Sequence, residues 1–276
     1  MKSDDVDPII ESALEEDMPG GDLTSESIIP ADSESQAVFL AKEEGILAGI
    51  EIACRVFEKI DPNIRCARRV EDGSRIHPGD RLAELAGNSV ALLKGERTAL
   101  NFLQRLSGIA TLTGKYVKAV EGYKAKILDT RKTTPLLRRL EKYAVKMGGG
   151  TNHRFCLSDM VMIKDNHLQI AGSVGAAIER ARENVNPGIR IEVETTTLAM
   201  VREAVRSGAD MIMLDNMSLA EMKEAVAWVN RRVPLEASGN VRLSRVKEIA
   251  ATGVDFISVG GLTHSYESLD ISLEFL

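Results

Sequence analysis

Aromatic residues are scarce in this sequence, and basic residues do not outnumber acidic ones. Phe, Trp and Tyr together make up 4% of the 276 residues. There are 35 Lys and Arg residues against 41 Asp and Glu residues, which gives a formal net charge of −6 at pH 7. Nucleic-acid binding depends on a basic surface and often on aromatic side chains that stack on bases. The composition therefore argues against a general nucleic-acid-binding protein.

Cysteine is also rare, and long apolar runs are absent. Cys54, Cys66 and Cys156 are odd in number and form no Cys-x-x-Cys pair, so neither a disulfide scaffold nor a cysteine-rich zinc site is expected. No stretch approaches the roughly 18 apolar residues of a membrane-spanning helix, and the acidic residues 1–10 do not resemble a signal peptide. These absences predict a soluble, reduced, cytoplasmic protein that does not bind a membrane.

The first part of the chain, up to about residue 107, has mixed helical and strand patterns. Apolar spacing predicts helices over residues 4–17, 50–60 and 94–120, and strands over 36–41, 46–49 and 81–87. Gly108 and Gly114 are positions at which the long third helix could bend or divide.

After residue 120, short apolar runs alternate with helical segments. The runs cover residues 126–129, 160–164, 189–194, 211–215, 233–238 and 255–259. The last four runs end at Glu194, Asp215, Ser238 and Val259, and these ends are 21, 23 and 21 residues apart. This spacing fits one strand, one helix and their loops per unit. It predicts a parallel α/β barrel with fewer than eight units.

Polar and charged residues follow the predicted strands, and they fall into three sets. In α/β barrels the carboxyl ends of the strands meet at one mouth, where catalytic groups lie. The cationic set is Arg131, Lys132, His153, Arg154 and Lys164. The acidic set is Glu194 and Asp215, and the loop set is Ser238, Gly239, Asn240, Gly260 and Gly261. Together they suit an anionic co-substrate and a sugar phosphate bearing a diphosphate, with Mg²⁺.

Each of these residues also has a structural explanation when it is considered alone. A strand-end salt bridge accounts for Lys164, helix caps account for Glu194 and Asp215, and a surface position accounts for His153. Motifs of other classes are missing: the sequence has no P-loop, dinucleotide-binding, zinc-protease or α/β-hydrolase signature. The prediction of a site for an anionic co-substrate and a sugar phosphate therefore rests on the cationic, acidic and loop sets occurring together.

The motifs themselves resemble those of the quinolinate phosphoribosyltransferase family. The resemblance covers essentially the whole chain and lies in a series of motifs in the same order. They are GGDLTS at 20–25, GERTALNFLQRLSGIAT at 95–111, DTRKTTP at 129–135, LEKYAVKMGGGTNHR at 140–154, DMVMIKDNH at 159–167, EVE at 192–194, LDN at 214–216, EASGNV at 236–241 and ISVGGLTHS at 257–265.

The resemblance implies a fold, a reaction and an assembly. The implied fold is an N-terminal α/β sandwich over residues 1–107, joined by the tail 267–276, and an incomplete seven-stranded barrel over 108–266. The implied enzyme is a decarboxylating pentosyltransferase of de novo NAD biosynthesis. It converts quinolinate and phosphoribosyl pyrophosphate to nicotinate mononucleotide, pyrophosphate and CO₂ with Mg²⁺. The implied assembly is a homodimer with shared sites, in some members built into a hexamer.

The resemblance also assigns roles to residues. Arg97 matches an arginine donated across the dimer, and Lys132 matches a lysine near the diphosphate. The matches to the quinolinate-binding set are Arg131, His153, Arg154 and Lys164. Glu194 and Asp215 match the acids that hold the ribose hydroxyls and Mg²⁺. The matches to the phosphate loops are Ser238, Gly239, Asn240, Gly260 and Gly261.

Two residues depart from the family pattern, which usually has glycine at both positions. Leu136 stands after Pro135, where it could alter the loop above the pyridine ring and so leaves open a related enzyme with another acceptor. Asn240 tolerates the left-handed conformation and is expected to keep its turn. Two other classes are weaker alternatives: an aldolase that forms a Schiff base at Lys164, and a non-catalytic binding protein.

Overall fold

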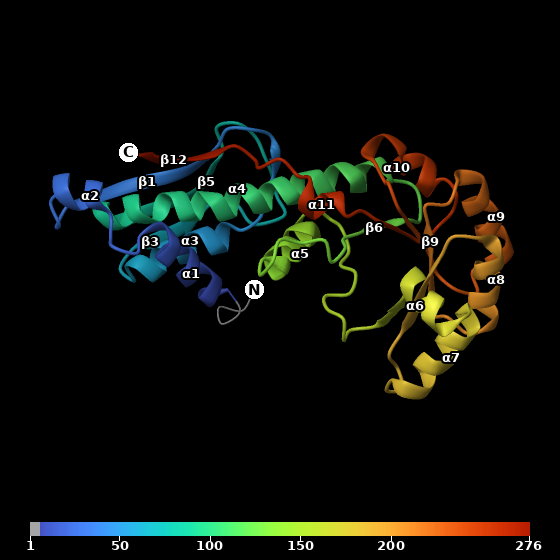
Figure 1. Ribbon diagram of the computed structural model, residues 1–276. Coiled ribbons are helices and arrows are strands. Elements are labelled where there is room, and N and C mark those ends of the chain that lie inside the picture. Colours follow the sequence, from blue (N-terminus) through green and yellow to red (C-terminus); the bar gives the residue numbers. More distant parts are fainter. Residues whose placement is uncertain (1–5) are drawn as a thin grey trace. The chain divides into compact units, whose positions relative to one another are not determined.

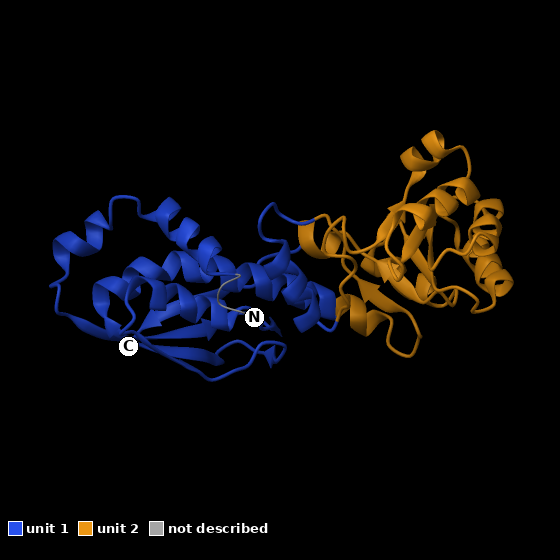
Figure 2. Cartoon of the chain, turned by 90° about the horizontal axis from the view of Figure 1, so that it is seen from below, with its two compact units in different colours: residues 1–114, 133–149, 265–276 blue, residues 115–132, 150–264 orange. Residues whose placement is uncertain are grey.

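The computed structural model describes residues 6–276, which form two compact units (Figures 1 and 2). Unit 1 contains the described residues up to Gly114, with Thr133–Gly149 and Ser265–Leu276. Unit 2 contains Lys115–Lys132 and Gly150–His264. The two units are defined by contacts between residues, whereas the domains expected from the sequence are defined by a change in its pattern. The units therefore do not test the expected domain bounds, which stay a prediction. Within the described part, no helix is both long and apolar enough to cross a bilayer.

Unit 1 is built on a four-stranded antiparallel sheet with the order β12-β1-β5-β3. Its strands are β1 (Glu34–Ala41), β3 (Arg65–Arg68), β5 (Arg81–Asn88) and β12 (Ile271–Phe275). A separate two-stranded pair joins β2 (Gly45–Ile46) to β4 (Arg75–Ile76). Because β12 pairs with β1, the end of the chain completes the sheet of unit 1.

The helices of unit 1 supply most of its core. They are α1 (Asp7–Asp17), α2 (Leu23–Ile28), α3 (Ile50–Ile60), α4 (Ser89–Ala119) and α5 (Arg138–Met147). Residues 4 and 5, where the first predicted helix begins, lie outside the described part. Phe57 of α3 and Phe39 of β1 are fully buried, and their rings meet edge to face at 6.0 Å. This contact fixes α3 against the sheet.

Helix α4 is continuous, so it does not divide at Gly108 or Gly114. The glycines have another role. A Cβ atom at Gly108 would overlap the carbonyl oxygen of Glu267, and one at Gly114 would overlap the Ile46 side chain. Both positions therefore lack a side chain because another segment passes close to the helix.

The expectation that all cysteines are reduced is wrong for one pair. Cys54 of α3 and Cys66 of β3 form a disulfide, with their Cα atoms 5.8 Å apart. Cys156 has a free thiol. The number and spacing of the cysteines could not show the bond, because the packing of α3 on β3 brings the two residues together.

Unit 2 is built on a parallel sheet whose strands alternate along the chain with helices. Its strands are β6 (Lys126–Leu128), β7 (Val161–Ile163), β8 (Ile191–Thr195), β9 (Met211–Asp215), β10 (Leu235–Ser238) and β11 (Phe256–Ser258). Its helices after α4 are α6 (Asp165–Ala171), α7 (Val174–Asn184), α8 (Leu198–Arg206), α9 (Leu219–Val229), α10 (Leu243–Ala250) and α11 (Gly261–His264). The sheet order is β6-β11-β10-β9-β8-β7. All six predicted strands are confirmed.

The sheet has six strands rather than the seven that the resemblance implies. Beyond β6, Thr151 forms a single parallel bridge to Leu128. Its N–H donates to Ile127 O at 2.8 Å, and its carbonyl accepts the N–H of Asp129 at 3.2 Å. One bridge is too little regular pairing to form a strand. The three glycines at 148–150, directly before Thr151, disfavour a longer strand here.

Candidate active site

The predicted site residues of the barrel all belong to unit 2, and most of them end or follow its strands, whereas His153 and Arg154 follow the single bridge at Thr151. Glu194 lies near the end of β8, and Asp215 and Ser238 end β9 and β10. Asp215 pairs in register with Ser238. Because the strands are parallel, these ends share one edge of the sheet. The structure thus places the acidic set and the loop set together, as expected.

The two acids have different neighbours. Oε2 of Glu194 lies 3.4 Å from Nζ of Lys164, the residue that follows β7. Oδ2 of Asp215 accepts a hydrogen bond from Nδ2 of Asn216 at 2.8 Å. Both carboxylates are only partly exposed. Their oxygen atoms on neighbouring strands are the ligand type that Mg²⁺ prefers, so the residues present fit this ion.

Asn216 connects Asp215 to the loop after β10. Its Oδ1 accepts a hydrogen bond from Nδ2 of Asn240 at 3.0 Å. Gly239 has a φ of 92°, and a Cβ atom there would overlap the Asn216 side chain. Asn240 has a φ of 49°, which confirms that it adopts the left-handed conformation. The loop thus requires glycine at 239 and tolerates asparagine at 240.

Lys132 lies beside the loop after β11. A Cβ atom at Gly260 would come within 3.0 Å of the Lys132 side chain. The carbonyl of Lys132 accepts a hydrogen bond from the Thr263 hydroxyl at 2.7 Å. The structure therefore joins the predicted diphosphate lysine to the predicted phosphate loop at Gly260 and Gly261.

Two guanidinium groups near this edge form no ion pair with another residue of the described part. Within residues 6–276, Nε of Arg131 is buried without a hydrogen-bond partner. The Arg154 guanidinium contacts Met160 O at 3.3 Å and Met162 Sδ at 3.4 Å. Burial and the charge of Arg131 lower the pKa of Arg154. Two arginines held close together with weak partners form a site that an anionic ligand would stabilise.

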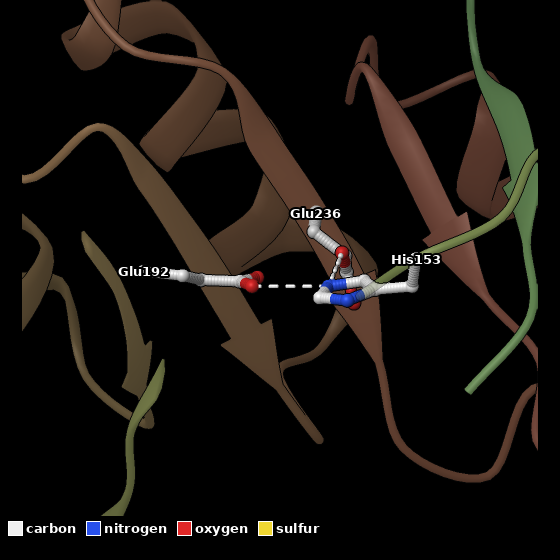
Figure 3. Close-up of side chains that lie close together, drawn as sticks. All are labelled: His153, Glu192 and Glu236. Carbon is white, nitrogen blue, oxygen red and sulfur yellow. Dashed lines mark ion pairs between the residues drawn. The ribbon is translucent and has the colours of Figure 1, made fainter. Parts of the chain in front are cut away.

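His153 lies deeper than a surface position would place it. Its side chain is 7% exposed, and its Nε2 lies 3.0 Å from Glu192 and 3.2 Å from Glu236 (Figure 3). Its backbone N–H donates to Asp129 Oδ1 at 2.8 Å. Burial opposes protonation of the ring, but the two carboxylates favour it and raise the pKa of His153. The backbone N–H of Arg154, which points at Nδ1, opposes a second ring proton there, so the geometry supports a single proton on Nε2. Burial also raises the pKa of Glu236.

Sequence reasoning assigned no role to Glu192, Glu236 or Asn216. Side chains alternate along a strand, so Glu192 shares a face with Glu194, and Glu236 shares a face with Ser238. The sequence did offer one signal: an acid lies two residues before Glu194 and another lies two residues before Ser238. Asn216 had only its place after Asp215 to mark it.

Arg97 and Leu136 belong to unit 1, whereas the residues described above belong to unit 2. Arg97 is exposed on α4. Leu136 is 88% exposed and has a φ of 66°. The roles predicted for the individual site residues, Arg97 included, stay predictions.

The chain is similar over its whole length to known proteins. Family models for the quinolinate phosphoribosyl transferase N-terminal and C-terminal domains match residues 22–107 and 109–274. The probable carboxylating nicotinate-nucleotide pyrophosphorylase of Bacillus subtilis is 46% identical, over 94% of this chain and 89% of its own length. A mitochondrial decarboxylating quinolinate phosphoribosyltransferase (2a) of Nicotiana tabacum is 45% identical, over 98% of this chain and 82% of its own.

Solved structures give the same result. The crystal structure of NadC from Streptococcus pyogenes has a TM-score of 0.97 and 42% identity, and the match covers 100% of this chain and 99% of that one. The nicotinate-nucleotide pyrophosphorylase from Francisella tularensis has a TM-score of 0.96 and 40% identity, over 100% and 98% of the two chains. The chain therefore belongs to the quinolinate phosphoribosyltransferase family.

Proposed function

We propose that this protein is a decarboxylating quinolinate phosphoribosyltransferase of NAD biosynthesis. It transfers the phosphoribosyl group of phosphoribosyl pyrophosphate to quinolinate and releases pyrophosphate and CO₂, which leaves nicotinate mononucleotide. The observation that carries this proposal is the strand-end edge of unit 2. There, two weakly neutralised arginines, Arg131 and Arg154, accompany two acids, Glu194 and Asp215.

The cations suit the two carboxylates of quinolinate. Arg131 and Arg154 offer planar groups that bind carboxylates through paired hydrogen bonds. Lys164 adds a point charge and forms an ion pair with Glu194, one of the two acids. This pairing supports a role in binding and gives no support to a Schiff-base lysine, which needs a neutral amine.

The acids and loops suit phosphoribosyl pyrophosphate. Glu194 and Asp215 would hold the ribose hydroxyls and Mg²⁺, which neutralises diphosphate charge when it is bound. Backbone N–H groups at 238–240 and 260–261 would hold the 5′-phosphate. Lys132, beside Gly260, would meet the diphosphate.

The reaction needs positioning and electrostatic stabilisation more than covalent help from the protein. The ring nitrogen of quinolinate attacks the anomeric carbon as the bond to pyrophosphate breaks, and positive charge develops on the ribose ring. Glu194 and Asp215 carry the charge that stabilises this centre. The nitrogen becomes cationic, and its charge stabilises the electron pair that stays on ring carbon 2 when the 2-carboxylate leaves as CO₂. A proton from solvent replaces it on the ring.

The proposal extends to assembly and location. A homodimer in which the partner's Arg97 completes each site is supported by the family resemblance and by the exposed position of Arg97 on α4. Three such dimers would build a hexamer. A cytoplasmic location is supported by the likeness to bacterial relatives, although several plant relatives are named as mitochondrial or chloroplastic.

The deciding experiment measures CO₂ release from carboxyl-labelled quinolinate. Release should require quinolinate, phosphoribosyl pyrophosphate and Mg²⁺ together, and the product should be nicotinate mononucleotide. Asp215→Asn serves as the inactive control. Nicotinate replaces quinolinate in a parallel reaction, because Leu136 leaves open a different acceptor. Folded protein that gives no product from quinolinate, or that prefers nicotinate, would contradict the proposal.

A further inference from the structure

Glu192 and Glu236 are acids that the proposed reaction does not use. Both are fully buried, on β8 and β10. Figure 3 shows their carboxylates converging on the ring of His153, at the distances of ion pairs. Two buried carboxylates with one imidazole between them cost the fold more than apolar side chains of the same size would. Such an arrangement calls for a function that outweighs the loss of stability.

The three side chains could in principle hold a metal ion, because one ligand atom from each lies within 4.8 Å of the others. The contact on the far side of the ring disfavours a metal. Nδ1 of His153 accepts a hydrogen bond from the backbone N–H of Arg154 at 2.7 Å. A neutral imidazole that binds a metal through Nε2 carries its proton on Nδ1 and cannot accept there. The ring proton therefore belongs on Nε2, beside the carboxylates.

The hydrogen bond from the Arg154 N–H to Nδ1 also joins Arg154 to the group formed by His153, Glu192 and Glu236. The carboxylates attract the Nε2 edge of the ring at 3.0 and 3.2 Å, through charge and without the alignment of a hydrogen bond. Nδ1 at the other edge contacts the peptide from which the Arg154 side chain starts. Within residues 6–276, the Arg154 guanidinium donates hydrogen bonds to a carbonyl and a thioether, and the carboxylates of Glu192 and Asp159 act on it through their charge. These weak acceptors, the carbonyl and the thioether, do little to orient the Arg154 side chain, so its orientation depends on the position of its backbone.

We infer that Glu192 and Glu236 are positioning residues that act through His153 to aim Arg154 at a carboxylate of the aromatic dicarboxylate substrate. This inference rests on the proposed function. It gives His153 a role that differs from direct binding, because both ring nitrogens face groups of the protein itself. It also explains why unit 2 keeps two acids buried beneath a site for an anion.

The test compares two substitutions at each glutamate. Glu192→Gln and Glu236→Gln keep a polar oxygen facing the Nε2–H, whereas Glu192→Met and Glu236→Met keep only the volume. The Met variants should raise the KM for quinolinate about tenfold or more and leave the KM for phosphoribosyl pyrophosphate within about twofold. The Gln variants should retain most of the quinolinate affinity. Each variant is assayed well below its Tm, because removal of one member of a buried charged set destabilises a fold.

Thr195→Val is the matched control. Thr195 is buried on β8, faces the side of the strand opposite to Glu192, and donates to Met213 O. Its loss should leave both KM values unchanged. Equal rises in both KM values in the Met variants, a rise in the control, or no rescue by Gln would overturn the inference. So would a stoichiometric metal in the purified protein that the Met variants lose.

Nitrogen-15 NMR of the histidine ring and the arginine side chains separates this inference from the proposed function. The wild type and Gln variants should show a protonated Nε2 on His153, with the signals assigned by His153→Asn. The Met variants should move both this signal and that of Arg154 Nε. An inactive wild type that still shows this pattern would refute the proposed reaction and leave the positioning intact. Unmoved Arg154 signals would refute the positioning.

Discussion

At the scale of single residues, backbone conformation distinguishes the two departures from the family pattern. Leu136 and Asn240 both stand where the family usually has glycine, and both have positive φ. Asparagine adopts this conformation with little cost because its short polar side chain bonds locally. Leucine has no such compensation, and the Leu136 side chain is exposed. The first departure therefore strains the chain, and the second does not.

Leu136→Gly should raise the free energy of unfolding by up to about 1.6 kcal/mol. Relief of the left-handed conformation is worth about 1–2 kcal/mol, and the greater freedom of glycine in the unfolded chain offsets about 0.4–1 kcal/mol of it. Urea denaturation gives the value. Leu136→Ala keeps a Cβ atom and should match the wild type. A glycine variant less stable than the alanine variant would show that Leu136 is not strained.

Asn216→Gly should raise the KM for phosphoribosyl pyrophosphate about fivefold, which corresponds to the loss of roughly 1 kcal/mol of hydrogen bonding. The amide of Asn216 holds both Asp215 and Asn240, and glycine keeps the backbone at its φ of 53°. Asn230→Gly is the control, because Asn230 also has positive φ but only ends α9. An unchanged KM in the first variant would remove Asn216 from the site.

At the scale of elements, the close approach of neighbouring segments to α4 explains two glycines that helix propensity alone does not. Helix α4 continues through Gly108 and Gly114 because neighbouring segments pack where side chains would be. The sequence shows the glycines but not their neighbours, so a break and a close contact predict the same residue. Only the placement of residue 267 against the helix distinguishes them.

Gly108→Ala should lower the free energy of unfolding by about 1–3 kcal/mol through overpacking, although alanine favours a helix by about 1 kcal/mol. The added methyl group would meet the backbone oxygen of Glu267, which cannot rotate away. Gly114→Ala would meet the end of the Ile46 side chain, which can change rotamer, so its loss should be smaller. Thermal unfolding of both variants measures the difference, and equal losses would contradict the packing explanation.

Helix α1 is tied to α3 by charge. Asp7 accepts hydrogen bonds from Arg55 at 2.7 and 3.0 Å and pairs with Lys59 at 2.6 Å. These partners hold the pKa of Asp7 well below its usual value. The ionised form stabilises the fold above about pH 4, and this contribution is lost as the pH falls through the lowered pKa.

Asp7→Asn should therefore cost about 1 kcal/mol at pH 7, a modest value because Arg55 is partly exposed and screened. The difference from the wild type should shrink below about pH 4, where the unfolded carboxylate begins to protonate. Urea denaturation at several pH values follows this change. A difference that stays constant down to pH 2 would mean that the charge of Asp7 contributes nothing.

At the scale of the whole molecule, net charge and local charge point in opposite directions. The chain carries a formal charge of −6, yet unit 2 concentrates Arg131, Lys132, Arg154 and Lys164 near one sheet edge. A small anion responds to the local field of its site rather than to the total charge. The acidic composition thus argues against binding to an extended polyanion and leaves a compact anionic substrate possible.

Mixing two inactive variants tests whether the site is shared between subunits. Arg97→Ala and Lys164→Ala should each be folded and inactive. An equimolar mixture should recover about a quarter of wild-type activity, because half of randomly formed dimers are hybrids and each hybrid has one intact site. Activity and subunit exchange are measured together, the latter with fluorescent labels. Complete exchange without recovered activity would show that Arg97 acts within its own subunit or not at all.

The sequence by itself determined the alternating strands and helices of unit 2, because apolar runs at regular spacing allow few other arrangements. It also placed Glu194, Asp215 and Ser238 at strand ends, since a strand end is a local feature. The tertiary structure alone decided which distant residues meet. It joined Cys54 to Cys66, placed Gly108 against Glu267, and directed Glu192 and Glu236 to His153. Such contacts depend on three-dimensional packing, which residue type and spacing along the chain do not record.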